Sequence, residues 1–198
     1  MISKVHGIGY NCGKYPTSIG NKRIKEYTLW AAMLDRCTSK FQNNHHSYIG
    51  TSCSENFKSY SFFYEWCQSQ VGYKNKDANG EVWHLDKDIL VKGSKVYSEN
   101  TCVFLPRRLN ALLVNRSLFR GNSPLGVSWA ENAGKFTVWC KGVKTRKYLG
   151  SFNSEIEAFN VYKEFKQKTI KQVAEQYKSQ IDPRAYKALI NYEVNIDD

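Results

Sequence analysis

The sequence predicts an α+β fold with an N-terminal helical region, a strand–strand–helix motif, and then a three-stranded antiparallel sheet packed on a helix. Three patterns carry this prediction. Aromatic residues recur every three to four positions up to residue 67, which is helical spacing. Two short alternating segments precede a Leu-rich stretch near residue 110, and three more lie between residues 124 and 152. Their order predicts two domains, residues 1–118 and residues 119–198.

The composition restricts the classes of partner. The 198 residues carry a formal net charge of +11, and 41% of them are hydrophobic, so the chain can bury a core of ordinary size. The excess of Lys and Arg favours a polyanionic partner, nucleic acid first and an anionic membrane surface second. The apolar runs are too short to span a bilayer, and the N-terminus lacks a secretory segment. We therefore expect a cytoplasmic protein that binds double-stranded DNA and no membrane.

The six cysteines are scattered without a CxxC pair, so we expect reduced and mostly buried thiols. The set nearest to a zinc-binding pattern is Cys37, His45, His46 and Cys53. The two histidines are adjacent in a polar loop, so their side chains need not converge on one ion. No structural zinc is expected.

The N-terminal region predicts a short hairpin or extended arm followed by two helices. Gly and Pro residues before residue 25 favour turns. Apolar positions at Tyr27, Trp30 and Cys37 follow with helical spacing, and Phe57 and Tyr60 begin a second stripe of the same kind. These two aromatic-rich helices are expected to support the motif that follows them.

Residues 82–113 predict two strands followed at once by a helix. Residues 82–86 alternate as a strand, a Gly-containing turn follows, and residues 101–105 form the return strand. The helix after them directs its Leu side chains at the strands and leaves Arg107, Arg108 and Asn110 on the open side. Asp86 at the strand end and Asn110 on the helix can offer hard oxygen ligands to a divalent cation, Mg²⁺ or alternatively Mn²⁺.

The segment from Val82 to Leu113 resembles the ββα-metal motif of HNH endonucleases, in particular the phage-encoded proteins of the homing type. It reads VWHLDKDILVKGSKVYSENTCVFLPRRLNALL, and its LDKDIL stretch matches the signature of that group. The resemblance implies a DNA endonuclease of a phage-infected bacterial cell, with Asp86 and Asn110 as metal ligands. It also implies that Asn100 and Thr101 are structural loop residues at the start of the second strand.

The general base is where this sequence departs from the family, because Lys87 stands at the position of the family's His. His84 lies two residues before Asp86 on the same strand face and can reach the site. Lys87 needs a depressed pKa to act as a base, but as a cation it can stabilise phosphorane charge. Asp88 is a further ligand or a capping group for the loop. The candidate catalytic residues are His84, Lys87 and Asp88.

The segment from residue 116 to residue 147 holds seven basic residues against one acid, Glu131, which is unusual for a merely solvated face. Three short strands joined by Gly- and Asn-containing turns are expected here, and Ser154 caps the helix that follows. This helix is expected to extend to residue 177. A break near Pro183 precedes a last short helix, and residues 193–198 alternate like a strand.

Period two assigns the side chains of the middle strand to two faces. Lys135, Thr137 and Trp139 fall on one face, whereas Phe136 and Val138 should pack under the helix. A core role and a DNA-binding role are equally open for Trp139.

The motifs GVSW, KFTVW, KYLGSF and EIEAFNVY resemble the ethylene-response-factor type of DNA-binding domain, the APETALA family, which lays such a sheet into the major groove. The resemblance implies DNA contacts from basic and aromatic side chains of the sheet. Together with the Arg residues around the preceding helix, the candidate DNA-binding residues are Arg107, Arg108, Arg116, Arg120, Trp129, Lys135, Trp139, Lys141, Lys144, Arg146 and Lys147.

The function expected from these features is metal-assisted hydrolysis of phosphodiesters by a DNA-binding endonuclease. One alternative is a non-cleaving DNA-binding protein, regulatory or architectural, whose strand–strand–helix unit is a degenerate scaffold. Another is a phage protein whose basic face binds an acidic host factor. The sequence is compatible with a monomer and with a dimer.

Overall fold

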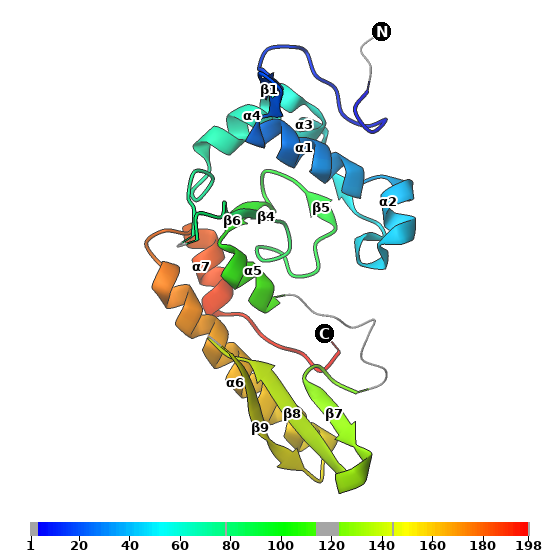
Figure 1. Ribbon diagram of the computed structural model, residues 1–198, viewed down its shortest axis with the longest axis vertical. Coiled ribbons are helices and arrows are strands. Elements are labelled where there is room, and N and C mark those ends of the chain that lie inside the picture. Colours follow the sequence, from blue (N-terminus) through cyan, green and yellow to red (C-terminus); the bar gives the residue numbers. More distant parts are fainter. Residues whose placement is uncertain (1–3, 78, 114–122, 144, 198) are drawn as a thin grey trace. The chain divides into compact units, whose positions relative to one another are not determined.

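The chain folds as two units, Met1–Pro106 and Arg107–Asp198, which are described separately. The computed structural model describes residues 4–77, 79–113, 123–143 and 145–197 (Figure 1). The predicted α+β class is confirmed, since helices and small sheets occur in both units. The division at residue 106 places α5 (Arg107–Leu113) in the second unit, whereas the sequence had suggested a boundary at residue 118.

Two helices carry the core of the first unit, α1 (Lys25–Arg36) and α4 (Tyr60–Ser69), as their aromatic spacing predicted. Trp30 is fully buried, and its indole N–H donates to the carbonyl oxygen of Phe57 at 2.8 Å. The second predicted helix is interrupted, because Ser59 separates α3 (Glu55–Lys58) from α4 and caps α4 with its hydroxyl group. The unit also contains β1 (Ser18–Ile19), β2 (Lys22–Arg23), α2 (Ser39–Asn44), η1 (His46–Tyr48), β3 (Ser52–Cys53), β4 (His84–Asp86), β5 (Val96–Tyr97) and β6 (Val103–Leu105).

Near the N-terminus, where a hairpin or an extended arm was expected, the structure has a hairpin, in which β1 pairs antiparallel with β2. The two strands predicted in the central motif also pair antiparallel, with Asp86 of β4 opposite Val103 of β6. The connection between them folds back onto the helical region, because β5 pairs in parallel with β3 and sets Tyr97 opposite Cys53. This last pairing joins segments far apart in the chain and has no local sequence signal.

The second unit is built on a three-stranded antiparallel sheet of β7 (Val127–Ala130), β8 (Lys135–Lys141) and β9 (Arg146–Phe152), in that order. The short 3₁₀ helix η3 (Glu131–Ala133) joins β7 to β8. The long helix α6 (Glu155–Tyr177) runs along the sheet, and α7 (Pro183–Ile190) packs back on it (Figure 1). The Ser154 hydroxyl accepts the N–H of Glu157, so the predicted cap is confirmed.

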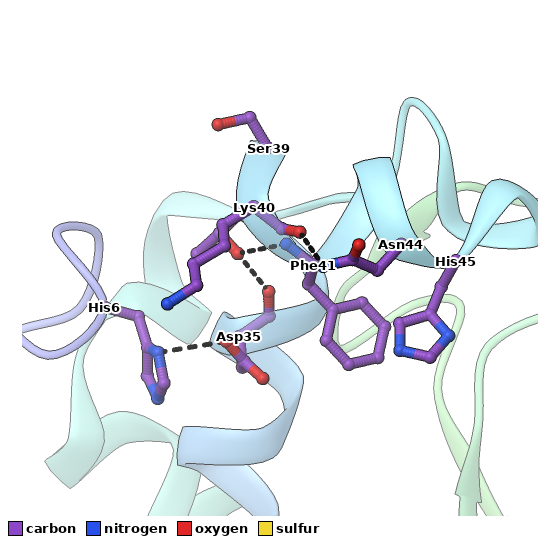
Figure 2. Close-up of a pocket in the computed structure, with 8 residues that line it drawn as sticks. His6, Asp35, Ser39, Lys40, Phe41, Asn44 and His45 are labelled. Carbon is purple, nitrogen blue, oxygen red and sulfur yellow. Dashed lines mark hydrogen bonds and ion pairs between the residues drawn. The ribbon is translucent and has the colours of Figure 1, made fainter.

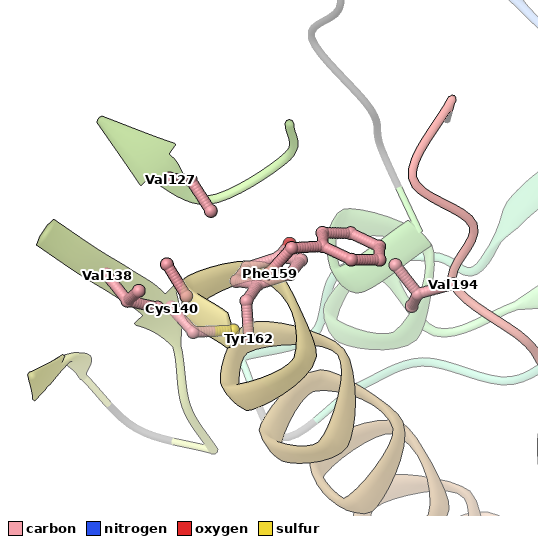
Figure 3. Packing of buried hydrophobic residues seen from close by; sticks show 7 residues of the cluster. Val127, Val138, Cys140, Phe159, Tyr162 and Val194 are labelled. Carbon is pink, nitrogen blue, oxygen red and sulfur yellow. The ribbon is translucent and has the colours of Figure 1, made fainter. Parts of the chain in front are cut away.

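One face of this sheet is buried against α6. Figure 3 shows Val138 and Cys140 of β8 directed at Phe159 and Tyr162 of α6. Gly126, just before β7, has φ 78°, and a Cβ at this position would lie 2.0 Å from the Tyr162 ring. The close approach of β7 to α6 therefore requires Gly here.

The C-terminal segment differs from its prediction. Residues 193–197 form no strand, although their alternation had suggested one. Val194 instead inserts into the cluster between the sheet and α6 and is 1% exposed (Figure 3). Burial of a single apolar side chain needs no strand partner, so alternation in a short segment was insufficient evidence for a strand. No helix among the described residues combines the length and apolar character needed to cross a bilayer.

Candidate functional site

The face of the sheet that points away from α6 gathers basic and aromatic side chains. The rings of Trp139 and Tyr148 are 5.0 Å apart between centroids and are 40% and 49% exposed. The guanidinium carbon of Arg146 lies 5.1 Å from the centroid of the Trp139 ring. We call this surface the free face. Its residues are Ser128, Lys135, Thr137, Trp139, Lys141, Arg146, Tyr148 and Ser151.

The two faces predicted for the middle strand agree with the structure. Val138 is fully buried and Phe136 packs against the same cluster, whereas Lys135 and Trp139 are exposed. The exposure of Trp139 on the free face argues against a core role, because a core residue would point at α6, and its role in DNA binding stays a prediction.

A β-bulge decides which residues of β9 reach the free face. Val138 pairs with Gly150 and Trp139 pairs with Tyr148, so Leu149 is an inserted residue. The insertion reverses the alternation of side chains on its N-terminal side. Tyr148 was missing from the sequence-based candidates, and counting in twos from the end of β9 would have placed it under α6.

Two predicted DNA-binding residues lie on the α6 side of the sheet. Lys147 pairs with Cys140 in the register, and its Nζ is 5.8 Å from the centroid of the Phe165 ring. Trp129 pairs with Phe136, and the centroids of these two rings are 4.8 Å apart. Trp129 is half-exposed, but it does not belong to the free face. The expectation that both residues share one surface with Trp139 is therefore corrected.

Two more predicted DNA-binding residues, Arg107 and Arg108, lie on α5. Arg108 of α5 donates to Gln176 Oε1 at 3.1 Å and to the carbonyl oxygen of Val143 at 2.9 Å, which makes it a structural link to α6. Arg107 is exposed on the same helix. The candidates that lie outside the described residues are Arg116, Arg120 and Lys144.

In the first unit, Asp86 is buried at the end of β4 and caps the turn after it. Its Oδ1 accepts the backbone N–H groups of Asp88 at 3.0 Å and Ile89 at 2.9 Å. Burial raises the pKa of this carboxyl above its ordinary value of 3.8, because desolvation penalises the charged form. The carboxylate predicted as a metal ligand therefore already organises its own loop.

Lys87, at the position of the family's general base, is 6% exposed. Its Nζ donates to Asp88 Oδ1 at 2.5 Å and to the carbonyl oxygen of Ser94 at 2.6 Å. The same nitrogen lies 5.7 Å from the centroid of the Tyr97 ring. Two oxygen acceptors and an aromatic face hold this ammonium group in the loop, so Lys87 stabilises the loop.

The remaining candidates of the central motif have different surroundings. His84 is exposed on β4, opposite Leu105 of β6. The Thr101 hydroxyl donates to the carbonyl oxygen of Val96 at 2.6 Å and accepts the Ser98 N–H at 3.1 Å, which supports its structural role in the loop. Asn100 is exposed in the turn before β6.

The predicted metal-ligand pair spans the two units, because Asp86 belongs to the first unit and Asn110 of α5 to the second. The pair therefore stays a prediction. In the part of the chain that the structure describes, no three His, Cys, Asp or Glu side chains are grouped so that they could hold a metal ion. A divalent ion at Asp86 would therefore need amide, backbone or water oxygens for at least some of its other ligands.

A pocket of about 550 Å³ in the first unit was not anticipated from the sequence. His6 and Asp35 are turned toward each other in Figure 2, with 3.2 Å between Nδ1 and Oδ1. The His45 ring packs on Phe41 at 4.2 Å between centroids. This contact joins the N-terminal segment to the last turn of α1, and residues so far apart in the chain leave no motif that could have signalled it.

Comparisons of the chain with protein-family models, curated proteins and solved structures gave no match.

Proposed function

We propose that the chain binds double-stranded DNA through the free face of its three-stranded sheet. The observation that carries the proposal is the exposed pair of Trp139 and Tyr148 with Arg146 stacked on it, flanked by Lys135 and Lys141. The three strands contain no Asp or Glu. Cations among planar rings suit DNA, because Lys and Arg neutralise phosphates while the rings pack against sugars and base edges.

The sheet also holds the side chains of the free face in fixed positions, which favours recognition of a nucleic acid. The free face is backed by the buried cluster of Val138, Cys140, Phe159 and Tyr162, so its side chains are displayed from a fixed sheet. Strands can enter the major groove when basic and polar side chains project from one face. The Ser128 hydroxyl on this face can donate to a phosphate oxygen, and so can whichever hydroxyl of the bonded Tyr148–Ser151 pair keeps a free hydrogen.

Binding of a fluorescent duplex, measured by anisotropy at several salt concentrations, tests this proposal. The affinity should fall steeply with salt, and Arg146→Ala and Lys141→Ala should each weaken binding and reduce the slope of log K against log salt by about 1. Lys147→Ala is the matched control, since it removes the same charge from the opposite face of the same strand.

Equal weakening by Lys147→Ala and Arg146→Ala would reject the free face as the contact surface. Weak binding of duplex at physiological salt, together with tight binding of an acidic protein, would favour the alternative of an acidic host factor.

We propose DNA cleavage by an HNH-type site as the second candidate function. The antiparallel pairing of β4 with β6 and the helix that follows β6 reproduce the order of elements in the resembling motif. The side-chain oxygens of Asp86 and Asn110 are hard ligands of the kind that Mg²⁺ and Mn²⁺ prefer. However, Asp86 Oδ1 already accepts two backbone N–H groups, and Asn110 lies in the other unit.

The candidate base for such a reaction is the exposed His84, since Lys87 is buried and bonded to two acceptors. Nicking of supercoiled plasmid in Mg²⁺ or Mn²⁺ tests the candidate, with His84→Ala and Asp86→Asn as variants. Asp86→Asn retains an oxygen for the two backbone N–H groups while it removes the charge. Nicking by the wild type that both variants lose supports cleavage. If the wild type nicks no more than the Asp86→Asn variant does, the chain is a DNA-binding protein that does not cleave.

A further inference from the structure

Arg36, the last residue of α1, carries a guanidinium group that the residues around it match only in part. Its Nη1 donates to the Tyr97 hydroxyl at 3.3 Å, and its Cζ lies 5.7 Å from the centroid of the Tyr48 ring. Among the residues that the structure describes, no Asp or Glu side chain forms an ion pair with Arg36. A guanidinium group has five N–H donors in a planar fork, so most of these donors are left for water or a ligand.

The partial burial of Arg36 makes its unmatched charge informative. Arg36 is neither buried nor fully exposed, and the groups that contact its guanidinium belong to tyrosines instead of acids. A cation that loses part of its hydration needs a counter-charge or hydrogen-bond acceptors, and an aromatic ring replaces only part of that loss. A bound anion would supply the missing compensation, and it can reach Arg36 from solution.

The Tyr97 hydroxyl is a second donor at the same place. Tyr97 is 3% exposed, and its oxygen accepts the hydrogen bond from Arg36. In the described ranges of the chain, no acceptor is found for the hydrogen of this hydroxyl. Because buried hydroxyl groups are nearly always hydrogen-bonded to their capacity, this hydrogen is available to a ligand oxygen beside Arg36.

Thr51 adds a buried donor to the same region. It is 4% exposed, and its Oγ1 has no hydrogen-bond partner among the described residues. Gln42 Nε2 donates to the carbonyl oxygen of Arg36 at 3.2 Å and to that of Thr51 at 2.8 Å, so one amide group joins the two backbone segments. Donors exceed acceptors here, which is expected of an anion-binding site and not of a closed core.

A second cation borders Tyr97 and has its own acid. Lys87 Nζ lies 5.7 Å from the centroid of the Tyr97 ring and donates to Asp88 Oδ1 at 2.5 Å. Asp88 therefore matches the charge of Lys87 and leaves the charge of Arg36 unmatched.

We propose that Arg36 and Tyr97 form a binding site for a phosphate group in the first unit. The N–H fork of Arg36 matches two phosphate oxygens, and the Tyr97 hydroxyl can donate to one of them. The phosphate belongs either to a free ion or to the backbone of a nucleic acid, since both present such oxygens. The site does not rest on the free face, which belongs to the second unit.

The proposal is tested on the purified full chain by ¹H–¹⁵N NMR spectra during titration with inorganic phosphate, with sodium chloride at equal ionic strength as the reference. The Arg36 Nε–H signal should shift saturably, with a dissociation constant of about 1 mM for a few charge-assisted hydrogen bonds. A parallel titration with a thymidine dinucleotide distinguishes the two sources. A saturable shift with the dinucleotide identifies the nucleic-acid backbone, and a shift with inorganic phosphate alone identifies a free ion. No saturable shift with either ligand, or an equal shift in chloride, would overturn the proposal.

Single variants test the two assigned groups. Arg36→Met keeps the length of the side chain and should abolish the phosphate-dependent shifts of backbone amides around Tyr97. Tyr97→Phe keeps the ring and should weaken phosphate binding about five- to tenfold. Arg23→Met is the matched control, since Arg23 also lies 5.7 Å from a Tyr ring, that of Tyr27, but is exposed. Undiminished binding by Arg36→Met, or an equal loss in Arg23→Met, would contradict the assignment, and the wild-type titration does not depend on the folding of any variant.

The phosphate site and the free face can fail separately. Arg146→Ala removes a cation of the free face and should leave the phosphate titration of Arg36 unchanged. Loss of the Arg36 shift in this variant would overturn the placement of the site in the first unit. A chain that binds phosphate at Arg36 but binds no duplex would support the site and reject only the free face.

Discussion

The charged residues of the central motif and those of the sheet have opposite surroundings. In the first unit, Asp86 and Lys87 are buried, and hydrogen bonds to their own loop occupy both side chains. In the second unit, Lys141 and Arg146 are exposed on the free face, where Arg146 stacks on an exposed Trp ring. Charge serves the fold in the first region, whereas in the second it is available to a ligand.

The difference shows that residue type and spacing do not by themselves define a functional site. A charged side chain that satisfies a buried loop cannot be withdrawn without a cost in stability, whereas an exposed cation on a packed sheet can be removed at little cost. The two regions can therefore be distinguished by how stability and ligand binding respond to substitution.

The largest effect is expected from Lys87→Ala, which removes an ammonium group that bonds to Asp88 and to the Ser94 carbonyl oxygen. The free energy of unfolding should fall by about 2–3 kcal/mol, because an acceptor loses its charged donor and the contact with the Tyr97 ring is lost. Urea denaturation measures this change. Lys141→Ala is the control and should stay within about 0.5 kcal/mol of the wild type. Equal losses in both variants would remove the contrast between the two regions.

Asp86→Ala should cost about 1–2 kcal/mol, since two backbone N–H groups lose their acceptor, and Asp86→Asn should cost less. The pKa of Asp86 is raised in the folded state, so the wild type loses stability as pH rises from 3.8 through the folded-state pKa. Asp86→Asn lacks this dependence, and its stability relative to the wild type should therefore improve over the same rise. A constant difference across these pH values in urea titrations would contradict the buried-carboxyl assignment.

Lys166 of α6 is a cation in the second unit that does not follow the contrast, because it is 6% exposed and burial lowers its pKa. Lys166→Met should raise the free energy of unfolding by roughly 1 kcal/mol near neutral pH. The unfolded state binds the extra proton between the folded-state pKa and 10.5, so the wild type should gain stability as pH rises through that interval and the Met variant should not. The exposed Lys168→Met is the control, and the same pH profile in both variants would argue against a buried amine.

The smallest change in stability is expected from Arg146→Ala, at most about 0.5 kcal/mol, since the guanidinium group is exposed. If the free face binds duplex, the same substitution should nevertheless weaken binding by roughly tenfold at low salt. Thermal melts and anisotropy on one preparation separate the two effects. A loss of stability large enough to explain the loss of binding would make Arg146 structural, as Lys87 is.

The helices and the middle strand of the sheet could be predicted because their patterns are local. The spacing of Tyr27 and Trp30 predicted α1, and the alternation of Phe136 and Val138 predicted which face of β8 packs on α6. In each case the period of the backbone fixes the direction of the side chain, and the neighbouring elements only supply the surface that covers it.

The edges of the sheet could not be predicted in the same way. The bulge at Leu149 turns Lys147 to the α6 side and brings Tyr148 to the free face, and the pairing of Trp129 with Phe136 removes Trp129 from that face. A one-residue change in register moves every later side chain to the other face, and register is set between strands.

The sequence by itself determined the α+β class, the helices α1, α6 and α7, the cap at Ser154, and the two faces of the middle strand. Tertiary structure alone decided that Lys87 is buried and that Tyr148 joins the free face. The physical reason is the separation along the chain of the residues that set each feature. Helical and strand periods are properties of consecutive residues, whereas burial and register depend on segments that only folding brings together.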